Sequence, residues 1–315
     1  MTTQSVYTST LVVESKTTIA DGVVDLVLRS HAALPSWTPG AHVELRLGHG
    51  LSRSYSLCGP PDDANCYRLG ILREPESRGG SAYVHDKLAV GDTVEVVGPT
   101  NHFELLPSPR YQFIAGGIGI TPLLPMIVAA EAAGADWHLL YGGRSRSSMG
   151  FLDELAVFGD RVTVHPQDES GLLDLSAVLG TPRDGTLVYS CGPTPLLDAV
   201  EQHCARWPAG ALHVERFAAA TPAHREADVA FEVEFARTGV TATVEAGVSI
   251  LDVATDNGVF ILRSCSEGVC GTCETELIEG NPDHRDSVLT PEDRAAGCFM
   301  PCVSRARSAR LVLDL

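Results

Sequence analysis

Four cysteines toward the carboxyl end of the chain have a spacing that predicts an iron-sulfur site. Cys265, Cys270 and Cys273 follow a C-x4-C-x2-C pattern, and 28 residues lie between Cys273 and Cys302. This is the spacing of plant-type 2Fe-2S sites. Two irons need four thiolates, so a tight loop can supply three of them while a distant segment supplies the fourth.

Other uses of these thiols remain open from the sequence: a zinc site, disulfides or buried free thiols. Structural zinc sites usually have two close C-x2-C pairs, and only one such pair is present. The chain has nine cysteines, an odd number, and five fall between Cys265 and Cys302, which disfavours a disulfide framework. Cys298 is an ambiguous fifth thiol, and we prefer Cys302 as the ligand because Cys298 lies closer to Cys273.

The segments around these cysteines resemble a known protein family. Cys265–Glu274, Pro282–Asp286 and Pro301–Arg305 look like the carboxy-terminal ferredoxin domain of phthalate dioxygenase reductase and vanillate demethylase reductase. The resemblance extends over essentially the whole chain. It implies FMN, NADH and a plant-type 2Fe-2S cluster as cofactors, with NADPH less expected than NADH. It also implies an antiparallel β-barrel flavin domain, an α/β parallel-sheet nicotinamide domain and an α+β β-grasp ferredoxin domain.

A second set of candidate residues is Arg53, Ser54, Tyr55 and Ser56, which match the R-x-Y-S pattern of ferredoxin-reductase-like barrels. An arginine can neutralise a phosphate, an aromatic ring can lie against the isoalloxazine, and a serine hydroxyl can reach a polar edge of the ring. For so short a motif, an ordinary strand with an exposed arginine is the alternative.

Arg78, Gly79, Gly80 and Ser81 form a second phosphate-binding feature, because glycines here open a predicted helix whose first amides can bind an anion. In the resembling reductases this stretch holds the phosphate of FMN. No additional segment suggests a place for an adenine, so FMN is favoured over FAD. By analogy alone, three residues of a barrel strand also line the flavin: Ile71, Leu72 and Arg73.

A glycine-rich turn after an apolar strand predicts a dinucleotide site. Gly117, Gly119 and Thr121 are its candidate residues, with Thr121 as the cap of the following helix. The turn departs from the G-x-G-x-x-G fingerprint, because Pro122 stands in place of the third glycine. Such turns also serve packing, so this motif alone is only suggestive.

Support comes from Cys191, Gly192 and Pro193 at the end of another predicted strand. They resemble the C-G-P motif of the same superfamily, in which the cysteine lies near the nicotinamide. A small core residue that ends a strand is the alternative for Cys191. Phe217 is a candidate by the same resemblance, since it lies in a segment whose phenylalanine approaches the flavin.

The choice between NADH and NADPH depends on Arg144 and Arg146, which follow the second predicted strand of this region. An enzyme meets the adenosine ribose at this place, and two arginines could hold a 2′-phosphate. They could equally contact the pyrophosphate or solvent. The family resemblance favours NADH.

The pattern of expected strands and helices along the chain predicts three domains, at residues 1–107, 108–222 and 223–315. Short strands with turn signals predict a barrel in the first, and alternating strands and helices predict a parallel sheet in the second. The third begins with a hairpin and a helix capped by Ser249. Strands expected in the barrel are Val23–Arg29, His42–Leu47, Tyr67–Glu74 and Thr93–Val97. Helices expected in the second domain are Pro122–Ala133, Gly150–Val157, Leu175–Leu179 and Pro195–Arg206.

Composition restricts the partners and the location. The formal charge of −17 argues against nucleic acid or anionic membrane surfaces. The first 15 residues lack the pattern of a signal peptide, and no stretch of about 18 apolar residues occurs. We therefore expect a cytoplasmic protein, a monomer, with a partner that has a basic docking face.

The resemblance implies a reductase that passes electrons from NADH through FMN and the 2Fe-2S cluster to a terminal oxygenase. The favoured partner is a Rieske-type aromatic oxygenase or O-demethylase. A hydride carries two electrons, a cluster accepts one, and a flavin can exchange both. Such chemistry needs orientation rather than acid–base catalysis, so we assign no general base. The alternatives are a reductase for a cytochrome P450, a non-enzymatic ferredoxin-like carrier and a zinc-binding interaction module.

Overall fold

The computed structural model describes residues 7–48, 51–74, 79–218 and 228–315. The chain divides into two compact units, residues 1–215 and 216–315. The boundary expected at residue 222 lies outside the described residues, and the boundary at residue 107, inside the first unit, stays a prediction. Among the described residues, no helix has the length and apolar character needed to cross a membrane.

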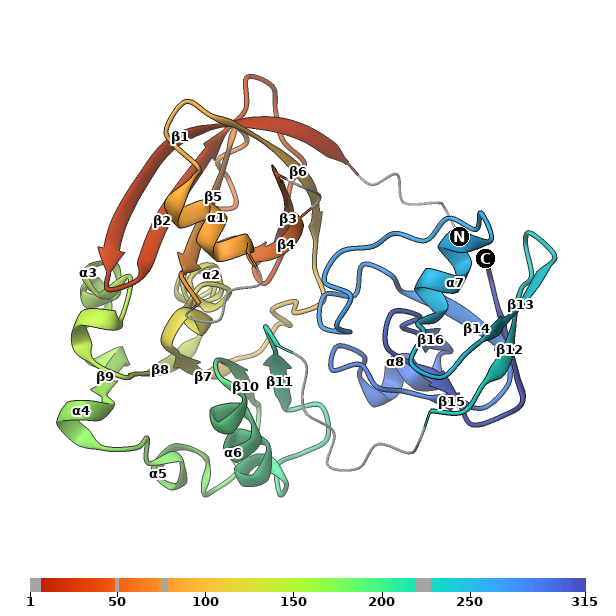
Figure 1. Ribbon diagram of the computed structural model, residues 1–315. Coiled ribbons are helices and arrows are strands. Elements are labelled where there is room, and N and C mark those ends of the chain that lie inside the picture. Colours follow the sequence, from red (N-terminus) through yellow and green to blue (C-terminus); the bar gives the residue numbers. More distant parts are fainter. Residues whose placement is uncertain (1–6, 49–50, 75–78, 219–227) are drawn as a thin grey trace. The chain divides into compact units, whose positions relative to one another are not determined.

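The amino-terminal half of the first unit is a six-stranded antiparallel barrel with one helix (Figure 1). The strand order is β4-β3-β6-β1-β2-β5, and a bridge between Leu57 and Leu69 joins the two edges of the sheet. Inward-facing side chains alternate along the strands, as Leu26 and Leu28 do in β2, and form the barrel core. The elements are β1 (Thr8–Ala20), β2 (Val23–Arg29), β3 (His42–Leu47), β4 (Leu51–Ser56), β5 (Cys66–Leu72), α1 (Gly80–Asp86) and β6 (Thr93–Thr100).

The sequence pattern predicts four of these six strands and omits β1 and β4. The pairing of β1 with β2 shifts register twice, so its apolar alternation is broken and leaves little period-2 signal. β4 is mostly polar, and five of its six residues are only half-buried. Both strands are therefore specified by pairing with their neighbours rather than by their own pattern.

The other half of the first unit is a parallel sheet with helices on both faces (Figure 1). Phe113 of β7 packs with α2 on one face, and its neighbour Ile114 packs with α5 and α6 on the other. Burial of both faces explains why its strands are almost continuously apolar. The elements are β7 (Arg110–Gly116), η2 (Gly117–Ile120), α2 (Leu123–Ala132), β8 (Asp136–Gly143), η3 (Arg146–Ser148), α3 (Leu152–Leu155), η4 (Ala156–Arg161), β9 (Val162–Pro166), α4 (Gln167–Ser170), α5 (Leu175–Leu179), β10 (Thr186–Cys191), α6 (Thr194–Cys204) and β11 (Leu212–Glu215).

Two local expectations in this half are wrong. The helix expected over Gly150–Val157 is shorter, because Phe151 has a φ of 62° and cannot lie inside a right-handed helix. Thr121 does not cap α2. Its hydroxyl instead donates to the carbonyl of Ile118 at 2.9 Å, and the helix begins after Pro122.

The second unit is an α+β fold around a five-stranded mixed sheet of order β13-β12-β18-β14-β16. β12 is antiparallel to β13 and parallel to β18, and α7 packs its apolar side on the core of this sheet. The expected cap is confirmed, because Ser249 accepts a hydrogen bond from the amide of Asp252 at 3.0 Å. The elements are β12 (Phe231–Phe235), β13 (Val240–Val244), α7 (Ile250–Asp256), β14 (Thr275–Glu279), β15 (Pro282–Asp283), α8 (Pro291–Ala295), β16 (Cys298–Phe299), β17 (Arg305–Ala306) and β18 (Arg310–Leu313).

Candidate functional site

The four cysteines predicted as ligands come together as two pairs in the second unit. Cys265 is hydrogen-bonded to Cys270, and Cys273 is hydrogen-bonded to Cys302. The first three lie in the loop between α7 and β14, and Cys302 lies in the turn after β16. Within the described part of the chain, no three histidine, cysteine, aspartate or glutamate side chains are grouped so as to hold one metal ion. Cys302 also interacts electrostatically with Cys270 of the other pair, so the two hydrogen-bonded pairs lie near each other.

Backbone amides point at these sulfurs. The amide of Glu267 donates to the Sγ of Cys265 at 3.3 Å, and the amide of Gly268 donates to Cys302. Gly268 has a φ of 70°, a conformation that favours glycine, and it turns the loop so that its amide faces inward. In the first pair, the hydrogen bond between the two thiols lowers the pKa of Cys270 to about 5 and raises the pKa of Cys265. In the second pair, the hydrogen bond with Cys273 raises the pKa of Cys302. The amides of Glu267 and Gly268 oppose these increases, and so favour the thiolate, the form of cysteine that binds metals.

The pairing distinguishes between the two metal sites considered from the sequence. A single tetrahedral zinc ion needs all four sulfurs around one point, whereas a two-iron cluster takes two thiolates on each iron. The residues present therefore fit a 2Fe-2S cluster. Met300 is fully buried with its Sδ 3.9 Å from the Sγ of Cys273, and it covers one side of the site with apolar atoms. Cys298 is half-exposed, and burial raises the pKa of its thiol to about 11.

In the first unit, the R-x-Y-S residues lie on β4, next to the start of α1. A Cβ on Gly80 would stand 2.3 Å from the Cγ of Arg53, so a glycine here lets the arginine cross the start of the helix. Gly79 has a φ of 96°, and Ser81 is buried with its hydroxyl bonded to a backbone amide. The structure thus brings Arg53, Gly79, Gly80 and Ser81 together. Arg78 lies outside the described residues.

The remaining residues of β4 differ in how deeply their side chains are buried. Tyr55 is half-buried against the barrel core, and burial raises the pKa of its hydroxyl to about 12. Ser54 is half-buried on the alternate side of the strand, and Ser56 is 4% exposed at its end. The ring of Tyr55 therefore lies on the same side of β4 as Arg53, and the buried hydroxyl of Ser56 lies on the other side.

The three residues expected from β5 and its end differ from one another. Ile71 is fully buried in the barrel core, so its side chain does not face an open site. Leu72 is half-buried. Arg73 is exposed and forms an ion pair with Asp86 of α1 at 2.8 Å. Leu72 and Arg73 are thus the accessible side chains of this group.

Two turns meet at adjacent strand ends of the parallel sheet. The sheet order is β11-β10-β7-β8-β9, so the chain proceeds from β7 outward to β9 and then returns to β10 on the other side. Ligands of open α/β sheets bind at such a switch point. A Cβ on Gly119 would stand 2.3 Å from the carbonyl oxygen of Cys191, so the two turns are in close contact. The predicted residues at this switch point are Gly117, Gly119, Thr121, Cys191, Gly192 and Pro193.

A buried carboxyl group lies beside this switch point. Glu215 ends β11 and is the cross-strand neighbour of Cys191. Burial raises the pKa of the Glu215 carboxyl to about 8, and the nearby hydroxyl of Ser56 moderates the increase. Burial and then Glu215 raise the pKa of Cys191 well above its usual value, so this residue stays a neutral thiol. Because Ser56 belongs to the barrel, Glu215 connects the two halves of the first unit.

The arginines expected at the adenosine end lie at the next strand end. Arg144 and Arg146 follow β8, and Arg146 donates to Glu169 of α4 at 3.0 and 3.2 Å. Arg144 is exposed. The edge where an adenosine ribose would lie therefore carries a carboxylate as well as two guanidinium groups.

Similarity to known proteins shows the family to which this chain belongs. Residues 233–307 match the family described as 2Fe-2S iron-sulfur cluster binding domain. Phenoxybenzoate dioxygenase subunit beta of Ectopseudomonas oleovorans is 46% identical over 301 residues, which cover 94% of each chain. The solved phthalate dioxygenase reductase, described as a modular structure for electron transfer from pyridine nucleotides to [2Fe-2S], is 36% identical, with a TM-score of 0.71 over 98% of both chains. The chain belongs to the phthalate dioxygenase reductase family.

The phthalate dioxygenase reductase fold also occurs within a longer protein. An intact type IV self-sufficient cytochrome P450 monooxygenase is 42% identical, with a TM-score of 0.91. That match covers 98% of this chain but 41% of the P450 chain.

Membership of the phthalate dioxygenase reductase family confirms the resemblance, the fold class and the oxidoreductase function expected from the sequence. The individual site residues stay predictions. Phe217 belongs to the second unit and is 43% exposed. Glu215, two residues before Phe217, was not among the site residues predicted from the sequence. The sequence feature that could have identified Glu215 is a single carboxylate at the end of strand β11.

Proposed function

We propose that this chain is the reductase component of an oxygenase system and carries electrons from NADH through FMN to a 2Fe-2S cluster. The observation that carries the proposal is the approach of Cys265 to Cys270 and of Cys273 to Cys302, because two pairs of thiols meet the needs of two irons. These four cysteines are the ligands of the cluster. Family membership supports the complete electron path.

The barrel binds FMN. Arg53 and the turn Gly79–Ser81 hold its phosphate, since a guanidinium can pair with two phosphate oxygens and a glycine turn admits close approach. Tyr55 lies against the isoalloxazine ring, and Ser56 reaches a polar edge of it. The accessible side chains Leu72 and Arg73 form the neighbouring wall.

NADH binds at the switch point of the parallel sheet. Gly117, Gly119 and Thr121 receive its pyrophosphate, because they form the turn after the first strand, where α/β sheets bind phosphates. Gly192 and Pro193 shape the nicotinamide end beside Cys191. The arginines after β8 meet the adenosine end.

Bound FMN supplies the conversion of a two-electron hydride into single electrons for the cluster. The residues of the chain hold donor and acceptor in position and exclude water. Cys191 is a fully buried neutral thiol, and Glu215 is mostly protonated at neutral pH. Together they provide an uncharged, dry wall at the nicotinamide end, which suits hydride transfer because solvent is kept from the reacting atoms.

The acceptor we propose is a Rieske-type aromatic oxygenase. A relative that matches almost the whole chain is named as a dioxygenase subunit. Plant-type clusters lie near about −400 mV and Rieske centres at roughly −150 to +300 mV, so transfer in this direction is downhill. Residues 229–315 contain 14 acidic residues against seven arginines, a formal charge of −7. Such a surface suits transient, salt-sensitive docking on a basic partner.

A cytochrome P450 is the second candidate acceptor. The observation in its favour is the structural match to the reductase portion of a self-sufficient P450. Reduction of a purified Rieske oxygenase and of a purified P450 can be compared in the same assay. A rate with the Rieske protein that falls steeply with salt supports the first candidate, and a faster, salt-insensitive rate with the P450 supports the second.

The test of the complete proposal is a visible spectrum of the anaerobically purified protein, with analysis of iron, acid-labile sulfide and extracted flavin. We expect two irons, two sulfides and one FMN per chain, and bleaching by NADH. Bleaching by dithionite alone indicates a carrier without nicotinamide-dependent activity. A colourless protein without iron and sulfide contradicts the proposal.

A further inference from the structure

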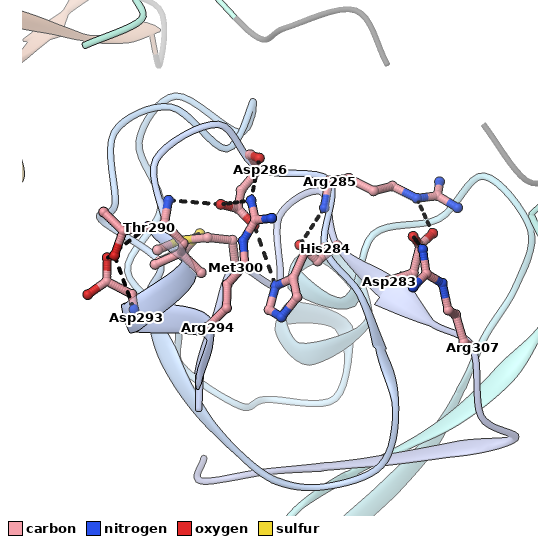
Figure 2. Close-up of polar contacts among 12 residues, drawn as sticks. Asp283, His284, Arg285, Asp286, Thr290, Asp293, Arg294, Met300 and Arg307 are labelled. Atoms are coloured by element: carbon pink, nitrogen blue, oxygen red, sulfur yellow. Dashed lines mark hydrogen bonds and ion pairs between the residues drawn. The ribbon is translucent and has the colours of Figure 1, made fainter. Parts of the chain in front are cut away.

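Asp286, labelled in Figure 2, packs on Gly268 of the loop that carries three of the four cluster cysteines. Its side chain is fully buried, with 0% exposure. Its Cα lies 2.9 Å from the point where a Cβ on Gly268 would stand, and the amide of Ser287 donates to the carbonyl of Gly268 at 2.8 Å. Gly268 in turn donates its own amide to Cys302. A single glycine therefore separates the backbone of Asp286 from a cluster sulfur.

Arg294 of α8 is the cationic partner of this carboxylate. Its guanidinium donates to the Oδ2 of Asp286 at 3.3 Å and to the carbonyl of the same residue at 3.1 Å. The amide of Leu289 donates to Oδ2 at 2.9 Å. Thr290 and Asp293 exchange hydrogen bonds as a capping box, which fixes the start of α8 and thereby the position of Arg294 (Figure 2). Both donors to the Asp286 side chain reach Oδ2, whereas Oδ1 has no hydrogen-bond partner among the described residues. The bond from Arg294 is charge-assisted and is therefore stronger than a bond between neutral groups.

His284 is the other titratable side chain that faces Asp286, with its Nδ1 3.6 Å from Oδ1. Burial, and then the charge of Arg294, lower the pKa of His284, so its ring is neutral at neutral pH. Arg285 is engaged by Asp283 at 2.7 Å (Figure 2). Among the described residues, Arg294 is thus the full positive charge bonded to Asp286.

Charges beside an iron-sulfur cluster change the free energy of adding an electron to it. Cluster potentials depend on net charge, on hydrogen bonds to the sulfurs and on exposure, and buried charges are little screened by salt. A negative charge opposes reduction, and a positive charge favours it. We propose that Asp286 and Arg294 tune the reduction potential of the 2Fe-2S cluster in opposite directions. Both are positioning residues that do not bind iron, and the inference rests on the proposed function because it requires the cluster.

The test is the midpoint potential of the cluster in the full-length holoprotein, followed by electron paramagnetic resonance during a redox titration. Asp286→Asn removes the negative charge and keeps the shape, so the potential rises. Arg294→Gln removes the positive charge, so the potential falls. We expect a change of up to about tenfold in the one-electron equilibrium constant in each direction, which is about 59 mV. Glu292→Gln is the matched control, because it removes an exposed acid from the same helix and leaves the potential unchanged.

The sign of the two shifts separates tuning by charge from a loss of packing. Shifts of the same sign, or shifts no larger than that of Glu292→Gln, overturn the inference, because loosened packing does not follow the sign of the deleted charge. If Asp286→Asn does not fold, Arg294→Gln and Arg294→Lys decide the question: the glutamine must lower the potential and the lysine must keep it. Wild-type protein without iron and sulfide contradicts the proposed function, whereas an intact cluster with unshifted potentials contradicts this inference alone.

Discussion

Gly70 of the barrel packs on Thr121 of the parallel-sheet half with no room for a side chain between them. A Cβ on Gly70 would stand 2.6 Å from the Cγ2 of Thr121 and 2.7 Å from the ring of Phe151. Strand β5 therefore lies directly on the turn proposed to bind the pyrophosphate of NADH. This contact sets the separation between the flavin side and the nicotinamide side of the first unit.

The contact between Gly70 and Thr121 predicts the effect of Gly70→Ala. The added methyl group overpacks the junction, which costs about 1–3 kcal/mol of stability. Because it also displaces the two halves, we expect ferricyanide reduction by NADH to fall tenfold or more, up to about 100-fold. Dithionite reduction of the cluster stays normal. Gly150→Ala is the control, because its Cβ would meet Ile19 at 3.3 Å and Val23 at 3.5 Å, which is far less crowded than at Gly70. Unchanged kinetics in both variants contradict the prediction.

Replacement of single cysteines tests which thiol is the fourth ligand. Cys302→Ser removes a member of the pair with Cys273, so we expect loss of the cluster absorbance and of at least half of the bound iron. Cys298→Ser changes a half-exposed thiol outside both pairs and should retain iron and sulfide. The measurement is iron and sulfide per chain with the visible spectrum. The reverse pattern would assign Cys298 as the ligand.

The parts of the site that the sequence predicts are those encoded locally. The cysteine loop is recognisable because three ligands lie within nine residues, and the glycine turn because a strand, glycines and a helix follow one another directly. The glycine turn and the Cys191 turn each follow a predicted parallel strand. Since such strands end at the same edge of the sheet, the two turns are expected to meet there. Cys191 and Gly119 were therefore both identifiable before their contact was known.

The parts that the sequence does not predict depend on contacts between distant segments. Glu215 is significant because burial raises its pKa and because Ser56 of the barrel lies close to it. Asp286 lies in one of the segments that carry the family resemblance, but the sequence assigns no role to it or to Arg294. Only the packing of that loop on Gly268 buries the carboxylate. Periodicity carries no information about such contacts, because it reports one element at a time.

The ion pair between Arg146 and Glu169 predicts the dinucleotide preference. The carboxylate repels a 2′-phosphate and occupies the guanidinium that could bind one. We expect Glu169→Gln to raise the ratio of kcat/KM for NADPH to that for NADH several-fold, measured with ferricyanide as acceptor. Asp136→Asn is the control, because it removes an exposed acid at the opposite end of β8. Equal ratios in the two variants and the wild type show that Arg146 does not meet the ribose.

Glu215 predicts a specific loss of stability with rising pH. Its folded-state pKa of about 8 lies above the ordinary value of 4.5, so the folded protein holds this proton more tightly than the unfolded chain does. Its stabilising contribution is therefore complete below pH 4.5 and is lost as pH rises through 8, with a slope of at most about 1.4 kcal/mol per pH unit. Glu215→Gln cannot lose a proton, so its free energy of unfolding in urea should fall less than that of the wild type between pH 5 and pH 8. Parallel pH curves for the two proteins mean that the carboxyl is already ionised in the folded state, and the uncharged wall proposed beside the nicotinamide is then wrong.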